Sequence, residues 1–213
     1  MEQSEFLQIL AAIIIFTITA GFSFAINAEF EKLSLVFLFS VLIISISVMT
    51  KKITANLLDS DIEHELWQMQ QFGFTQNYKL KKPVPAGIIF PLIFSIISLG
   101  IIKFTGFLTY EARALKYRAS KRFGFYSYTE MTDWHHALIG ASGIIIVLII
   151  SLVSYLLPYN LEYLTKLSIY YAFWNLLPIS KLDGAQIFFG SRVVWAILFT
   201  ITLIALLFSI VIV

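Results

Sequence analysis

Six apolar blocks separated by polar stretches dominate the hydropathy pattern of the chain. An α-helix needs roughly 20 apolar residues to cross the hydrocarbon core of a bilayer, and most of the blocks come close to this length. The pattern therefore predicts an all-α polytopic membrane protein with about six transmembrane helices in a single membrane domain, residues 1–213. The blocks are residues 7–26, 33–50, 86–102, 137–157, 161–177 and 193–213.

Two longer polar stretches lie between these blocks. The middle of the first, residues 72–80, combines turn residues with alternating apolar positions, which predicts a short β-hairpin or an interfacial loop. The second, residues 103–136, interleaves apolar and basic side chains. This interleaving predicts an amphipathic segment that lies in the headgroup region on the membrane surface.

Composition supports the membrane class and excludes others. The chain is 59% hydrophobic and only 13% charged, so its main partner is the lipid bilayer. It has no cysteine, which excludes disulfides and a thiolate zinc site. A formal net charge of +2 is too small to favour nucleic-acid binding.

A polar, turn-rich stretch between the last two blocks is the candidate functional site. Its key residue is Asp183, because a carboxylate at bilayer depth costs several kcal/mol unless a metal, a proton or a cation accompanies it. Pro178 and Gly184 interrupt the helix and let the carboxylate turn inward. The structural alternative is a simple turn in which Asp183 caps the next helix.

The spacing of Asn175, Pro178, Asp183 and Gly184 resembles the second signature of the site-2 protease family, the intramembrane zinc metalloproteases. The resemblance implies that Asp183 corresponds to the third metal ligand, and that Asn175 and Pro178 shape a substrate-facing turn. It covers about residues 33–192, with 7–26 and 193–213 as additional transmembrane helices. Residues 185–192 look like archaeal-type members, which implies a multi-pass protein of a prokaryotic plasma membrane.

The catalytic half of that family's motifs is absent. Proteases of this kind need His-Glu-x-x-His on a helix, where two imidazoles bind zinc and the carboxylate activates water. Aligned through the resemblance, this place is occupied by the run from Ser47 to Lys51, and a lysine ammonium repels a divalent cation. A second family element, Gly-Pro-x-x-Asn, keeps Gly140 but has Ala141 and Ile144 in the other two positions.

Four further residues are candidate metal ligands if a metal is bound at Asp183. His64 and Glu65 begin a string that imitates the missing motif, although its last position is a glutamine, a poor zinc ligand. His135 and His136 are adjacent and would point about 100° apart on a regular helix. The structural alternatives are an interfacial turn with Trp67 at the headgroup level and the polar entrance of the fourth helix.

The resulting expectation is a non-catalytic homologue, a pseudoprotease, that binds a transmembrane helix or an extended peptide of another protein and needs no cofactor. The alternative is an active membrane zinc metalloprotease with an unorthodox site built on Asp183. A third, less favoured hypothesis is a small transporter that uses Asp183 as a proton or cation site, with Lys51 or Lys181 as the counter-charge.

Overall fold

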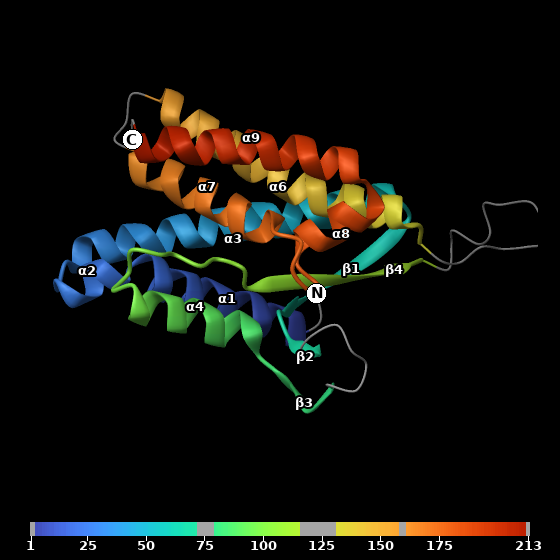
Figure 1. The fold of residues 1–213 in the computed structure, drawn as a ribbon, viewed down its shortest axis with the longest axis horizontal. Helices are drawn as coiled ribbons and strands as arrows, with labels where there is room; N and C mark the ends of the chain where they lie inside the picture. The colour runs from blue at the N-terminus through green and yellow to red at the C-terminus, as the bar shows by residue number, and fades with distance from the viewer. Residues whose placement is uncertain (1–2, 72–78, 116–130, 158–160, 212–213) are drawn as a thin grey trace, which may run out of the picture.

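The computed structural model describes residues 3–71, 79–115, 131–157 and 161–211. Most of its helices run along a common direction, and a small sheet lies against them (Figure 1). In chain order the elements are α1 (Gln3–Ala20), α2 (Phe22–Ile26), α3 (Phe30–Leu57), β1 (Ser60–Leu66), β2 (Met69–Gln71), β3 (Lys79–Val84), α4 (Ala86–Ile97), β4 (Leu108–Ala114), α6 (Asp133–Leu156), α7 (Glu162–Leu176), α8 (Asp183–Gly190) and α9 (Arg192–Val211).

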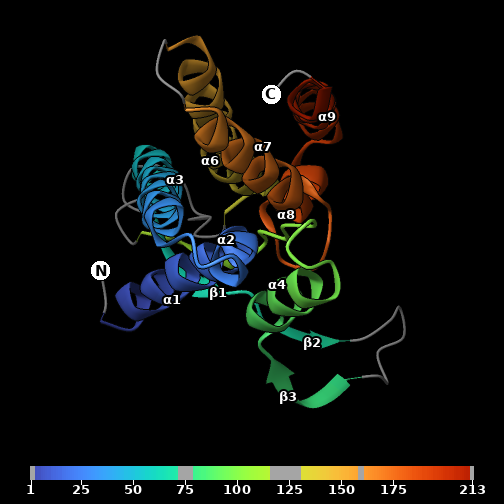
Figure 2. The same ribbon diagram turned by 90° about the vertical axis from the view of Figure 1, so that its left-hand side faces the viewer.

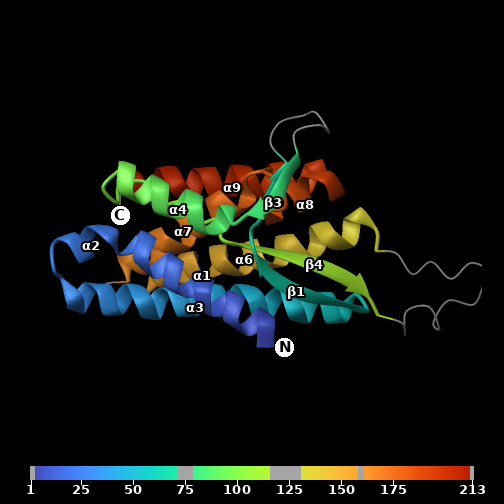
Figure 3. The ribbon, with the colours of Figure 1, turned by 90° about the horizontal axis from the view of Figure 1, so that it is seen from below.

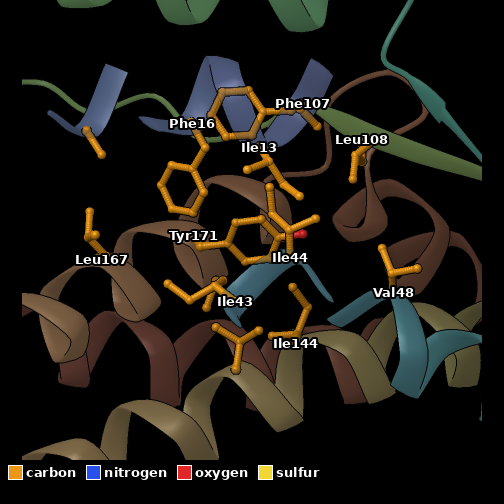
Figure 4. Packing of buried hydrophobic residues seen from close by; sticks show 14 of the residues in the cluster. Ile13, Phe16, Ile43, Ile44, Val48, Phe107, Leu108, Ile144, Leu167 and Tyr171 are labelled. Carbon is orange, nitrogen blue, oxygen red and sulfur yellow. The ribbon is translucent and has the colours of Figure 1, made fainter. Parts of the chain in front are cut away.

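The helices form two groups. The end-on view shows α6 to α9 in one group and α1, α2 and α4 in the other, and α3 lies at one side of the molecule, where it contacts both α6 and α1 (Figure 2). The core between these groups brings together Phe16 of α1, Ile44 of α3, Ile144 of α6 and Tyr171 of α7 (Figure 4). Close packing of such side chains holds helices together where the surrounding medium is itself apolar.

Three helices in the described part of the chain are long and apolar enough to cross a membrane: α3, α6 and α9. This result supports the prediction of a helical membrane protein, while the number of six spans stays a prediction. The block at residues 7–26 is divided at Gly21 into α1 and α2. The block at residues 161–177 gives α7, which is only 15 residues long.

The prediction of an amphipathic surface segment over residues 103–136 is wrong for the first part of that range. Strand β4 pairs antiparallel with β1, with a register from Ser60 opposite Ala114 to Leu66 opposite Leu108. Phe107, Leu108 and Tyr110 are buried, because this segment lies in the interior beside β1 (Figure 3), where Phe107 also packs on Phe16 of α1. Residues 116–130 of the predicted segment lie outside the described residues.

The hairpin prediction for residues 72–80 is only partly tested. Strands β2 and β3 pair antiparallel on either side of that segment, and residues 72–78 lie outside the described residues. The prediction of an interfacial turn around His64 and Trp67 is wrong. His64 lies in β1, Trp67 follows it, and both side chains are buried because α1 and α4 cover this part of the sheet.

Helix α1 covers the outer edge of β1 with polar side chains. The amide of His64 donates a hydrogen bond to the Glu5 carboxylate at 3.1 Å, and the amide of Leu66 donates to the Gln8 side-chain oxygen at 2.7 Å. These two outward-pointing amides would otherwise be free to pair with another strand. The β1 edge of this two-stranded sheet is therefore closed by the protein itself.

Candidate functional site

The structure joins Asp183 to Lys51 in a buried ion pair. The Lys51 Nζ lies 2.5 Å from Asp183 Oδ2, and the two side chains are 2% and 0% exposed. Lys51 comes from α3 and Asp183 from the first turn of α8, 132 residues later. The cation that the buried carboxylate requires is thus supplied by the chain.

Two glycines make the close approach of these helices feasible. A Cβ atom at Gly143 of α6 would overlap Cε of Lys51, so only glycine leaves room for the lysine side chain at this point. A Cβ atom at Gly184 would overlap the carbonyl group of Leu176 at the end of α7. Gly143 therefore serves close helix packing at this point.

An aromatic side chain from the sheet lies beside the ion pair. The Lys51 Nζ is 5.2 Å from the ring centroid of Tyr110, within the range of a cation–π interaction. The Tyr110 hydroxyl donates a hydrogen bond to the carbonyl of His136 at 2.7 Å. Burial, together with the charge of Asp183, raises the pKa of Tyr110 well above its ordinary value, so this phenol stays protonated.

The turn that carries the predicted signature is held by Asn175. Its side-chain Nδ2 donates to the carbonyl of Thr105 at 3.1 Å and to that of Tyr171 at 2.9 Å, and it is buried. The chain then leaves α7 through Pro178 and Ser180, which adopts a positive φ of 53°. Asn175 therefore lies in the last turn of α7, Pro178 in the connector, and Asp183 and Gly184 in the first turn of α8.

The alternative in which Asp183 caps the next helix is wrong. The N-cap position of α8 is Leu182, and no side chain makes a capping hydrogen bond there. The carboxylate of Asp183 points to α3 instead and uses Oδ2 for Lys51. The carboxylate therefore takes part in an ion pair between residues 132 positions apart in the sequence, and not in a local helix cap.

The candidate metal ligands lie in three different surroundings. The Nδ1 atom of His64 is 3.1 Å from Glu5 Oε1, and the other oxygen of that carboxylate, Oε2, lies 2.6 Å from Lys52 Nζ. Glu65 is only partly buried on β1. In the described ranges, no group of three or more His, Asp and Glu side chains is placed to hold a metal ion.

His135 and His136 lie in the first turn of α6, as predicted for the polar entrance of that helix. His136 lines a pocket of about 440 Å³ that also includes Tyr110, Ala112 and Lys181. Lys181, the other predicted counter-charge for Asp183, pairs instead with Glu111 at 3.0 Å on the surface.

Sequence reasoning missed two contributors to this site. Glu5 precedes the first apolar block and was not among the predicted site residues, but it reaches His64 and Lys52 from α1. Tyr110 lies in a segment expected on the membrane surface. A buried acidic residue at the start of an apolar helix is the signal that could have identified Glu5, while nothing in the pattern singled out Tyr110.

Comparison of the chain with protein-family models, with curated proteins and with solved structures found no match in any of the three.

Removing either partner of the buried ion pair should strongly destabilise the protein. Lys51→Met leaves the Asp183 carboxylate buried without a cation, and Asp183→Asn leaves the Lys51 ammonium buried without an anion. Each change should lower the free energy of unfolding by about 3–5 kcal/mol. The double variant should recover most of this loss. The free energies of unfolding of the wild type, the two single variants and the double variant, measured by denaturant titration in detergent, form the double-mutant cycle.

The exposed pair of Lys181 and Glu111 is the matched control for that cycle. These side chains are 65% and 46% exposed, so Lys181→Met should cost no more than about 1 kcal/mol. If the effects of Lys51→Met and Asp183→Asn on the free energy of unfolding are additive, and each is as small as that of Lys181→Met, the assignment of the pair as a buried interaction is contradicted.

His64 should make stability depend on pH. Burial lowers the pKa of His64, against the opposing effect of Glu5, so the unfolded chain takes up a proton at a higher pH than the folded chain. Stability should therefore fall as the pH decreases from about 6.5 toward the lower folded pKa. Melting temperatures between pH 8 and pH 5 should show a smaller loss in His64→Gln, and an unchanged loss would contradict this role.

Proposed function

We propose that this protein is a non-catalytic relative of the site-2 intramembrane metalloproteases that binds an extended segment of another protein. The observation that carries the first part is the Lys51–Asp183 ion pair. Lys51 stands where the resemblance implies the second zinc-binding histidine, and its ammonium contacts the carboxylate that corresponds to the third ligand. A positive charge supplied by the protein therefore takes the place that a metal ion would need.

The binding part of the proposal rests on the second edge of the β1–β4 sheet. In antiparallel pairs, residues alternate between exchanging hydrogen bonds with the partner strand and pointing these groups outward. The outward amide of His64 and the outward carbonyl of its partner Tyr110 fix this alternation, so Ala112 points its amide and carbonyl away from β1. The edge of β4 thus offers backbone groups for another strand.

A pocket lies along this edge. Tyr110, Glu111 and Ala112 form one side of the pocket of about 440 Å³, and residues of α8, including Gln186 and Phe189, form another. The Nε2 of Gln186 already donates to the Tyr110 carbonyl at 3.1 Å, as an incoming backbone amide would. Strand addition at such an edge gives affinity through main-chain hydrogen bonds, and adjacent pockets select side chains.

The alternative of an active zinc protease would require Lys51 to leave Asp183 and distant ligands to converge. His64 is held by Glu5, and His135 and His136 lie in the first turn of α6. Lys51 is the counter-charge that the transporter hypothesis requires for Asp183. The outward backbone groups of Ala112, beside the pocket, favour peptide binding over both.

Metal content tests the non-catalytic part. Purified wild type and Asp183→Ala, equilibrated with zinc and freed of the excess, should both show background zinc by elemental mass spectrometry. The reason is that the ammonium of Lys51 repels a divalent cation. Near-stoichiometric zinc that disappears in Asp183→Ala would overturn this part and favour the zinc protease.

A proline at position 112 tests the binding part. Ala112→Pro removes an outward amide without removing a hydrogen bond to β1, which edge strands tolerate. A fluorescent pool of eight-residue peptides rich in Val and Thr should bind wild type, measured by fluorescence anisotropy in detergent, and should bind Ala112→Pro markedly less. Ala112→Gly keeps the amide and should bind like wild type.

Peptides methylated on alternate backbone nitrogens separate strand addition from other contacts. Such peptides keep their side chains but lose the amide hydrogens on one edge, so wild type should not bind them. Equal binding of methylated and unmethylated pools, or unchanged binding by Ala112→Pro, would contradict strand addition at β4.

A further inference from the structure

A second site, separate from the Asp183 region, is formed by Lys103 in the connector between α4 and β4. This connector is fixed to α7, because the Thr105 hydroxyl donates to the Tyr170 carbonyl at 3.1 Å and the Thr105 carbonyl accepts from Asn175. Lys103 is partly buried against the same helix. The position of its ammonium group is therefore set by the fold.

The partner of this ammonium is a neutral side chain. Lys103 Nζ donates to the Tyr163 hydroxyl at 3.1 Å and lies 4.6 Å from the centroid of the Tyr163 ring. Lys103 makes no salt bridge to a carboxylate within the part of the chain that the structure describes. An ammonium group taken partly out of water without a counter-charge is costly.

A second lysine lies on the same side of α7. Lys166 follows Tyr163 by three residues, so the two side chains are neighbours on one helix face. Burial, with the positive charge of Lys166 as a further cause, lowers the pKa of Lys103 to about 8. The Lys103 ammonium, which contacts the Tyr163 phenol, is thus within the electrostatic reach of a second lysine from a segment about 60 residues away, an arrangement that an anion would stabilise.

The site lies near the ends of several apolar helices. Tyr163 is in the first turn of α7, and its hydroxyl donates at 2.6 Å to the carbonyl of Ala20, the last residue of α1. The C-terminal end of α6, the start of α7 and helix α2 lie toward the same end of the molecule (Figure 1). Lysines at the ends of membrane helices reach the level of the lipid phosphates.

We propose that Lys103, held by the Tyr163 hydroxyl, and the nearby Lys166 bind a phosphate group at this end of the helices. An anionic lipid headgroup and free inorganic phosphate share this chemistry. The site is independent of the proposed peptide-binding function, because it uses none of the residues of β4 or α8.

Native mass spectrometry and thermal unfolding of the detergent-purified protein test the site with three probes: phosphatidylglycerol, zwitterionic phosphatidylcholine and inorganic phosphate. Phosphatidylglycerol should bind wild type and raise its melting temperature more than phosphatidylcholine does. Lys103→Gln should weaken phosphatidylglycerol binding about fivefold, since a lysine near the membrane surface contributes about that factor toward an anionic lipid. Lys103→Arg should keep the binding.

Lys32→Gln is the matched control, because Lys32 is an exposed lysine near the start of α3 that already pairs with Glu29 at 2.8 Å. It should bind phosphatidylglycerol like wild type. If Lys103→Gln does not fold, Lys166→Gln replaces it with the same expectation. Stabilisation by inorganic phosphate alone, lost in Lys103→Gln, would identify the free ion as the ligand. Equal binding of all three probes, or equal effects of Lys32→Gln and Lys103→Gln, would overturn the proposal.

Discussion

A carboxylate buried among apolar helices is stable only with a partner, and this requirement organises the centre of the molecule. Asp183 meets it through Lys51, and both side chains lie in the interior. Because the pair joins the first turn of α8 to α3, it fixes where the turn after α7 must lie. The glycine at position 143 gives the lysine room, so the sequence of α6 is constrained by the same contact.

The apolar pattern and the requirement for a partner could both be read from the sequence. Three of the predicted spans correspond to α3, α6 and α9, and the chain breaks between α7 and α8 within the turn-rich stretch at Pro178. Lys51 was one of the two predicted counter-charges for Asp183. Asp183 pairs with Lys51 and not with Lys181 because of the way α3 and α8 pack. No local sequence pattern indicates a contact between residues 132 positions apart.

The sheet could not be predicted because its strands do not resemble isolated amphipathic strands. Residues 103–114 contain basic and aromatic side chains that suit a membrane surface, yet Phe107 and Tyr110 are buried. The pairing of β4 with β1 joins segments more than 40 residues apart, and α1 covers β1 from outside. Burial of these strands is thus a tertiary effect, and it overrides the local pattern.

The two edges of the sheet differ in a way that bears on function. Side chains of Glu5 and Gln8 satisfy the outward amides of β1, so α1 prevents strand addition on that side. On the other side, Gln186 satisfies one carbonyl of β4, and the adjoining backbone borders a pocket. Gln186 lies three residues after Asp183 on α8, so the contact that neutralises the buried carboxylate also positions the wall of this pocket. The Lys51–Asp183 ion pair therefore holds in place both the start of α8 and the wall of the pocket beside β4.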